Sequence, residues 1–216
     1  MSTKKATNKK AAVNSPYPQY ALEKCLRIPR SILEQNAGKA CSDSDSAKYS
    51  GVKLTGPFQM ELSAAIKFGL LNRPVQKQVE LTEISRKILK PLEKHDAING
   101  YREAVLKAPV ISEIYTHYRG ENLPDSQFLN NTLTEKFKIP SEKVDEFKSI
   151  LFDSLKTAEL MSETDGKYRL VDISADISMH GKAEESFKKL EKSTHVKEGE
   201  SCFVMMPFSD PLGSYC

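Results

Sequence analysis

The most constraining feature of the sequence is a glycine-bounded segment, residues 51–71, in which a helix pattern leads directly into a hairpin pattern. Thr55 is a residue type that caps helices, and Pro57 suits a first helical turn, where its missing N–H costs no hydrogen bond. Apolar residues then recur at helical spacing at Phe58, Leu62, Ile66 and Leu70. We therefore predict a helix from Thr55 to Gly69 that buries one face in a core.

The residues around this helix predict a small domain. Residues 70–81 have two short strand-like ends around a polar tip, and Thr82 can start a helix through Leu89. Upstream, residues 20–34 have a helical pattern that Pro29 must kink or divide, and residues 41–46 can cap a short helix through Tyr49. Helix, short helix, helix, hairpin and helix is the order of a winged helix. We predict such a domain at residues 15–91.

The same plan is predicted to repeat at residues 92–171. Pro109 divides two helical runs, 101–107 and 110–118, and Asp125 can cap a helix over residues 128–133. Pro140 precedes the strongest helical pattern, with apolar residues at Val144, Phe147, Ile150, Leu151, Leu155 and Ala158. Asp165-Gly166, a favoured tight-turn pair, lies between two strand-like ends in residues 161–171. The predicted fold class is mainly α with small β-hairpins, arranged as two tandem winged helix-turn-helix domains.

Positive charge is concentrated in the first part of the chain. Residues 1–90 contain 16 Lys and Arg against 7 Asp and Glu, a net charge of +9, whereas residues 91–216 contain 16 against 22, a net charge of −6. The first part can therefore face a polyanion, although solvated lysines explain the same excess. Residues 1–14 are polar and aperiodic, so we predict a disordered basic arm that contacts phosphates or simply aids solubility.

Nucleic-acid contacts are predicted on the surface side of the 55–69 helix and in the hairpin. The helix offers Gln59, Ser63, Ala64 and Lys67; only Gln59 suits adenine, and there is no arginine for guanine. Arg73 and Lys77 in the hairpin can hold phosphates, which positions a protein on DNA without specifying sequence. The predicted nucleic-acid-binding residues are Lys4, Lys5, Lys9, Lys10, Gln59, Ser63, Lys67, Arg73 and Lys77.

The second predicted domain is not expected to approach phosphate through its 141–159 helix. The exposed side of that helix carries Glu142, Asp145, Glu146, Asp153 and Glu159 among lysines. Carboxylates repel phosphate, so a protein partner or plain solvent is expected there. Tyr115, His117 and Tyr118 lie close together in sequence, and we expect core aromatics among them rather than a site.

No catalytic group, metal site or cofactor is predicted. The cysteines (Cys25, Cys41, Cys202 and Cys216) form no CxxC pair, and the histidines (His95, His117, His180 and His195) lie in separate segments. No apolar run approaches the roughly 18–20 residues that span a bilayer, and the N-terminus has no apolar signal region. We expect a soluble, cytoplasmic protein with no membrane partner.

The last part of the chain changes character twice. Residues 172–201 are polar and are predicted to be a linker. An abrupt apolar run, residues 202–208, then has the pattern of a buried parallel strand that proline ends. We expect residues 202–216 to be the truncated start of a nucleotide-binding-like domain that continues past Cys216.

Two resemblances extend this interpretation. Residues 55–70, 81–91 and 101–106 resemble the N-terminal helical module of a group of uncharacterised prokaryotic proteins, in which paired winged helices precede an effector domain; the likeness covers residues 17–171. Ser85 stands where that pattern has glycine. Residues 202–208 resemble the opening strand and Pro-Phe loop of nucleoside 2-deoxyribosyltransferase-like and TIR-like domains, which implies a nucleotide-lining role for Met206, Pro207 and Phe208. The catalytic carboxylates of that family would lie beyond Cys216.

Three functions are consistent with the sequence. The leading hypothesis is a non-enzymatic regulatory or sensing module that binds nucleic acid weakly through its basic first half. The second is a protein-interaction or oligomerisation module. The third is the N-terminal part of a nucleotide-processing effector whose catalytic residues would lie beyond Cys216.

Overall fold

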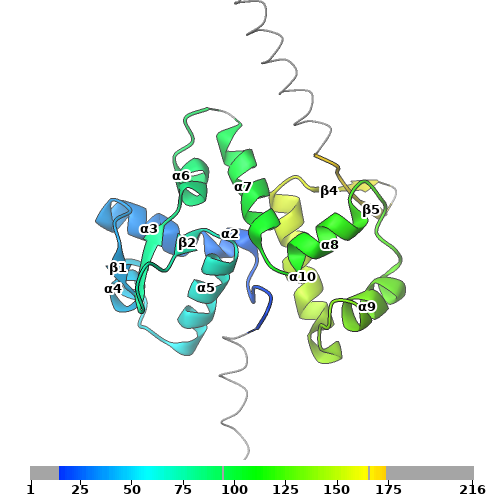
Figure 1. The fold of residues 1–216 in the computed structure, drawn as a ribbon, viewed down its shortest axis with the longest axis horizontal. Coiled ribbons are helices and arrows are strands. Elements are labelled where there is room, and N and C mark those ends of the chain that lie inside the picture. The colour runs from blue at the N-terminus through cyan, green and yellow to red at the C-terminus, as the bar shows by residue number, and fades with distance from the viewer. Residues whose placement is uncertain (1–14, 94, 165, 174–216) are drawn as a thin grey trace, which may run out of the picture. The chain divides into compact units, whose positions relative to one another are not determined.

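The computed structural model describes residues 15–93, 95–164 and 166–173 (Figure 1). The chain divides into a compact part that ends at Asp172 and a second part that begins at Ile173. Both predicted winged-helix segments lie in the compact part; we call them the N-subdomain (residues 15–91) and the C-subdomain (residues 92–171). The predicted basic arm, most of the predicted linker and the predicted strand at residues 202–208 lie outside the described residues.

The N-subdomain combines short helices with a three-stranded antiparallel sheet. Its elements are α2 (Leu22–Cys25), α3 (Arg27–Asn36), β1 (Cys41–Ser42), α4 (Asp43–Tyr49), α5 (Gly56–Lys67), β2 (Leu71–Asn72), β3 (Gln78–Leu81) and α6 (Glu83–Leu89). The central strand is β3, which pairs with β1 through Cys41 and Val79 and with β2 through Leu71 and Leu81. The predicted hairpin is confirmed. Strand β1 escaped prediction because two residues are too few to show alternation.

Local sequence explains where these helices begin and end. The Ser42 and Thr82 hydroxyls accept hydrogen bonds from the N–H groups of Asp45 and Ser85, which caps α4 and α6 as predicted. Pro57 lies in the first turn of α5, and Gly69 ends the helical segment at φ 69°, a backbone conformation that favours glycine. Thr55 holds the N-cap position of α5, but its side chain makes no capping hydrogen bond.

The predicted 20–34 helix is divided, but three residues before the proline. Helix α2 ends at Cys25, and α3 begins at Arg27, so Pro29 lies in the first turn of α3. A proline there removes only a hydrogen bond that the first turn lacks in any case. The division lies at Leu26, and Pro29 is accommodated in the first turn of α3.

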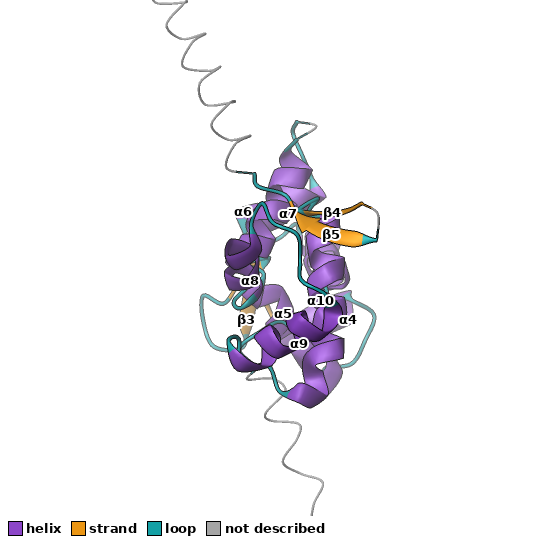
Figure 2. Ribbon diagram, turned by 90° about the vertical axis from the view of Figure 1, so that its right-hand side faces the viewer, coloured by secondary structure: helices purple, strands orange, loops and turns teal. Residues whose placement is uncertain are grey.

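The C-subdomain consists of helices and a two-stranded hairpin. Its elements are α7 (Asp96–Lys107), α8 (Ile111–Tyr118), α9 (Ser126–Glu135), a 3₁₀ turn η1 (Ser141–Lys143), α10 (Val144–Thr157), β4 (Met161–Thr164) and β5 (Lys167–Leu170). Met161 pairs with Leu170 and Thr164 pairs with Lys167, so β4 and β5 form the predicted antiparallel hairpin (Figure 2). Asp165, the first residue of the predicted turn pair, lies outside the described residues. Helix α7 begins five residues before the predicted run.

A third extended segment lies beside this hairpin. The N–H of Gly120 donates to the carbonyl of Leu170 (3.0 Å), and the N–H of Leu170 donates to the carbonyl of Glu121 (3.0 Å). The N–H of Leu123 donates to the carbonyl of Tyr168 (2.7 Å). Residues 120–123 therefore flank β5 as β1 flanks β3. Both subdomains follow one order: helix, short extended segment, two helices and a hairpin.

The two subdomains share buried contacts. Helix α2, whose Leu22 and Cys25 are buried, contacts α5, α7 and α10. The N–H of Leu22 donates to the buried hydroxyl of Ser154 on α10 (3.1 Å). The Tyr17 ring lies edge-on to Phe147, with 4.8 Å between ring centroids. The described fold is thus mainly α with small antiparallel sheets, as predicted.

Candidate nucleic-acid interface

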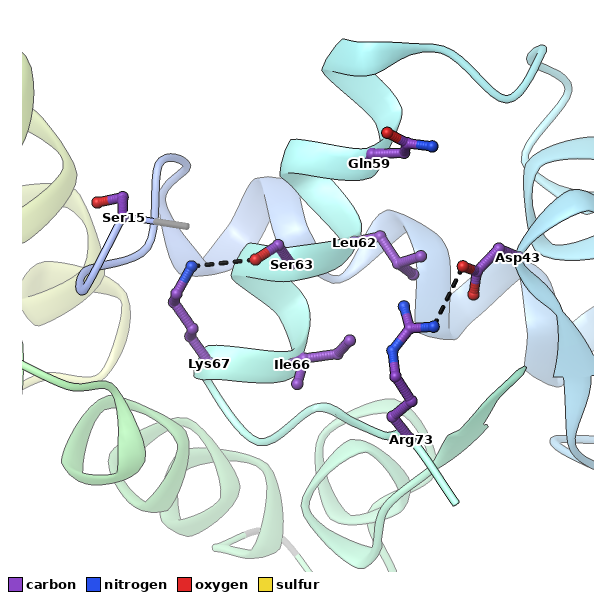
Figure 3. Close-up of a pocket in the computed structure, with 8 residues that line it drawn as sticks. All are labelled: Ser15, Asp43, Gln59, Leu62, Ser63, Ile66, Lys67 and Arg73. Atoms are coloured by element: carbon purple, nitrogen blue, oxygen red, sulfur yellow. Dashed lines mark hydrogen bonds and ion pairs between the residues drawn. The ribbon is translucent and has the colours of Figure 1, made fainter. Parts of the chain in front are cut away.

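A groove of about 540 Å³ lies between α5, the β2–β3 hairpin and the start of α4 (Figure 3). Its lining residues are Ser15, Asp43, Gln59, Leu62, Ser63, Ile66, Lys67 and Arg73. Four of the nine predicted nucleic-acid-binding residues, Gln59, Ser63, Lys67 and Arg73, therefore meet in one place. The groove is the strongest candidate site in the described part of the chain.

Helix α5 supplies one polar stripe of the groove. Gln59, Ser63 and Lys67 are spaced four residues apart, so they lie above one another on the same helix face. The Lys67 ammonium donates a hydrogen bond to the Ser63 hydroxyl (3.0 Å). Partial burial lowers the pKa of Lys67, because desolvation disfavours its charged form. An anion in the groove would compensate this desolvated cation.

Two residues of α5 differ from the prediction in how deeply they are buried. Phe58 and Leu62 are buried as predicted, but Ile66 is only partly buried and lines the groove. Ala64 was predicted on the surface side with Gln59 and Ser63, and this is wrong, because Ala64 is fully buried.

The hairpin contributes Arg73, which is held by a carboxylate at the start of α4. The Arg73 guanidinium lies 3.2 Å from Asp43 Oδ2, with the two side chains 35% and 18% exposed. The other oxygen, Oδ1, is buried and has no hydrogen-bond partner in the described part of the chain. The Asp43 N–H also donates to the Lys77 carbonyl (3.0 Å). Asp43 thus attaches both ends of the hairpin tip to α4 and partly neutralises Arg73.

The remaining predicted site residues lie elsewhere. Lys77 is exposed at the hairpin tip with φ 62°, and it does not line the groove. The arm lysines, Lys4, Lys5, Lys9 and Lys10, lie outside the described residues, as do Met206, Pro207 and Phe208. Sequence reasoning missed Asp43 and Ser15. Asp43 precedes Arg73 by 30 residues, and no local pattern couples the two.

Other candidate groups have structural explanations. The Tyr115 hydroxyl donates to the Val171 carbonyl (2.7 Å), so this buried tyrosine anchors the end of the C-subdomain. Burial raises the pKa of the Cys25 thiol, which disfavours a reactive thiolate. Among the described residues, no group of three or more His, Cys, Asp or Glu side chains could hold a metal ion. No helix of the described segments combines the length and apolar character needed to cross a membrane.

Comparisons with family models, with curated proteins and with solved structures give no match to this chain.

Proposed function

We propose that both subdomains are winged helices and that the N-subdomain binds the backbone of duplex nucleic acid through the α5 groove. The observation that carries this proposal is the convergence of Lys67 from α5 and Arg73 from the hairpin on one groove. In this assignment, α5 is the helix that approaches the duplex and β2–β3 is the wing. In this proposal the protein is a non-enzymatic regulatory or sensing module, whose role is binding rather than catalysis.

The charge of the N-subdomain supports a polyanionic ligand. Residues 15–91 contain 12 Lys and Arg against 7 Asp and Glu, a net charge of +5, whereas residues 92–171 contain 11 against 14, a net charge of −3. Contacts to phosphate release counterions and so supply sequence-independent affinity. The duplex should therefore bind the N-subdomain in preference to the C-subdomain.

The polar groups in the groove favour weak sequence preference. Gln59 is exposed and can pair with adenine, but Arg73 is engaged by Asp43 and lies in the hairpin rather than on α5. Lysine on α5 provides a point charge without the paired donors that read guanine. These features support binding through phosphates, with little discrimination among base sequences.

The proposal is tested by removing each groove cation. Lys67→Met and Arg73→Gln should each weaken binding of a 20-base-pair duplex several-fold and lower the slope of log affinity against log salt by about 1. Because its cation is desolvated in the folded chain, Lys67→Met should leave the melting temperature unchanged or raise it slightly. Fluorescence anisotropy over a salt series measures the binding, and circular dichroism measures the melting.

The same experiment includes a matched control variant and a variant that is expected to strengthen duplex binding. Lys48→Gln removes one positive charge from an exposed position outside the groove, so its effect should be clearly smaller. Asp43→Asn releases Arg73 from its carboxylate and should strengthen binding; Asp45→Asn, two residues away, serves as its charge-matched control. Equal losses in Lys48→Gln and Lys67→Met, or duplex binding that is insensitive to salt, would contradict the proposal.

A second function, a protein-interaction module, is favoured by exposed apolar side chains. Val75 at the hairpin tip is 60% exposed and Phe128 on α9 is 64% exposed. Burying such side chains would stabilise a complex with a protein partner or a second copy of the chain. Self-association that persists at high salt and is lost in Val75→Ser or Phe128→Ser would support this alternative. Sedimentation velocity measures it.

A further inference from the structure

The C-subdomain has a second groove at the position equivalent to the first. It has a volume of about 240 Å³ and lies between the start of α9, one face of α10 and the β4–β5 hairpin. In the N-subdomain, the corresponding elements are the start of α4, α5 and the β2–β3 hairpin. The two grooves differ in their side chains: the lining of the second includes two aromatic rings as well as two lysines, whereas the lining of the first has no aromatic ring among the described residues.

Two aromatic rings form one wall of this second groove. Phe152 on α10 and Tyr168 on β5 lie with their ring centroids 5.0 Å apart and their planes tilted by 52°. Both side chains are partly exposed and both line the groove. A planar aromatic ligand can stack on such a surface, and every nucleobase offers a flat face.

Lysines surround the two rings. Lys148, Phe152 and Lys156 are four residues apart on α10 and so share one face. Lys148 lines the groove, as does Lys167 from the hairpin, and Lys156 lies beside it over the Tyr168 ring. The Lys148 ammonium donates to the Ser126 hydroxyl (2.8 Å) and to Asn130 Oδ1 (3.1 Å). An ammonium has three N–H donors, so one remains for a ligand.

Carboxylates nearby reduce this positive charge without cancelling it. The Lys156 ammonium lies 5.1 Å from the Tyr168 ring centroid and 3.7 Å from the Glu163 carboxylate. Asp125 lines the groove at the start of α9, and its side chain makes no capping hydrogen bond. Among the described residues that line the groove, two lysines, Lys148 and Lys167, therefore stand against one carboxylate, Asp125. The aromatic wall has to supply much of the affinity and all of the preference for a base over a plain anion.

We propose that this second groove binds a nucleotide of single-stranded nucleic acid, with the base on Phe152 and Tyr168 and a phosphate on Lys148 and Lys167. Bases in a duplex are already stacked and paired, so their faces cannot reach the rings, whereas a single strand can offer them. This site is separate from the α5 groove and does not depend on the function proposed for it. The exposed carboxylates elsewhere on α10 restrict the contact to this face.

The site is tested directly by photo-crosslinking the full chain. A twelve-nucleotide oligo(dT) with one 5-iododeoxyuridine is irradiated with the protein, and the crosslinked peptide is identified by mass spectrometry. Crosslinks at Phe152 or Tyr168 are expected. Crosslinks confined to the N-subdomain would overturn the proposal, and this readout needs no variant that has to fold.

Affinity measurements with the same oligo(dT) supply the second test. Tyr168→Leu keeps an apolar side chain but removes the flat ring, and it should weaken binding about tenfold or more. Tyr118→Leu, a partly buried tyrosine of the same subdomain outside the groove, is the matched control and should change binding less than twofold. Lys167→Gln should lower the salt slope by about 0.7. Equal effects of Tyr168→Leu and Tyr118→Leu would overturn the proposal.

Competition experiments distinguish recognition of the base from recognition of phosphate alone. They also distinguish a single strand from a free nucleotide as the ligand. Polyphosphate should displace oligo(dT) poorly, and displacement at the same phosphate concentration as unlabelled oligo(dT) would show a charge-only site and overturn the proposal. Displacement by dTMP alone would support a free mononucleotide as a sufficient source of the ligand. Displacement only by oligonucleotides would support the strand. Lys67→Met should leave oligo(dT) crosslinking at Tyr168 intact, which separates this site from the α5 groove.

Discussion

Arg27→Met is expected to lower the free energy of unfolding by about 3 kcal/mol, because it leaves a buried carboxylate without its cation. Arg27 on α3 makes two hydrogen bonds to Glu61 on α5, at 3.0 and 2.6 Å. The Glu61 side chain is only 5% exposed, whereas Arg27 is 44% exposed, which places the cost at the low end for a broken ion pair. A loss of this size corresponds to roughly 6–12 °C in melting temperature.

Two further variants show whether the lost pairing causes the effect. Arg30→Met changes an exposed arginine three residues along the same helix and should shift the melting temperature far less. The double variant Arg27→Met with Glu61→Leu removes both charges, and it should recover most of the loss, since an apolar pair often replaces a buried ion pair at little cost. Thermal melting followed by circular dichroism measures all three. A double variant no more stable than Arg27→Met would refute this explanation.

Gly100→Val is expected to cost about 3 kcal/mol, because α7 lies too close to α6 for a side chain at this position. A Cβ atom on Gly100 would lie 2.7 Å from Ile88 Cγ1 and 3.3 Å from Lys87 Cβ. Glycine disfavours a helix interior by about 1 kcal/mol relative to alanine, so Gly100→Ala should lose less than Gly100→Val. The contact joins the two subdomains, and its disruption should loosen them from each other.

The matched control for this contact between α6 and α7 is Asn99→Val, which places the same β-branched side chain on the exposed side of α7. Urea denaturation should give a much lower midpoint for Gly100→Val than for Asn99→Val. If the two variants unfold at the same urea concentration, the close approach of α6 and α7 does not determine stability.

The elements that the sequence predicted best are those with strong local signals. The 55–69 helix combines Pro57, a four-residue apolar spacing and Gly69, and it forms as α5 with Phe58 and Leu62 buried. The hairpin at residues 161–171 combines a tight-turn pair with strand-like flanks, and it forms as β4–β5. Each of these signals lies within a few residues of the structure that it determines. Contacts with distant parts of the chain therefore did not change the local outcome.

The features that escaped prediction depend on distant contacts. Residues 96–100 contain glycine and asparagine, which disfavour helix, yet they begin α7 where Gly100 packs against Ile88. Glu61 lies on a predicted helix, but its burial depends on Arg27, 34 residues earlier. The Asp43–Arg73 pair likewise connects positions 30 residues apart. Contacts between residues so far apart produce no periodic pattern in a single sequence, so they could not be predicted from it.

The candidate site was predicted in part for the same reason. Gln59, Ser63 and Lys67 follow from helical periodicity alone, because positions four apart share a face. That Arg73 lines the same groove, and that Asp43 holds it, follows only from the folded hairpin. The aromatic groove of the C-subdomain was missed because carboxylates outnumber lysines along residues 141–159, while the face with Lys148, Phe152 and Lys156 becomes distinct only beside β5.

The central claim is that the α5 groove is where duplex nucleic acid binds, and an NMR titration of the ¹⁵N-labelled chain tests it most directly. A twelve-base-pair duplex at low salt should shift the amide resonances of Gln59, Ser63, Lys67 and Arg73 first, with α8 and α9 unaffected. Raising the salt should reverse these shifts together. Shifts confined to the C-subdomain, or no shifts at millimolar duplex, would contradict the claim.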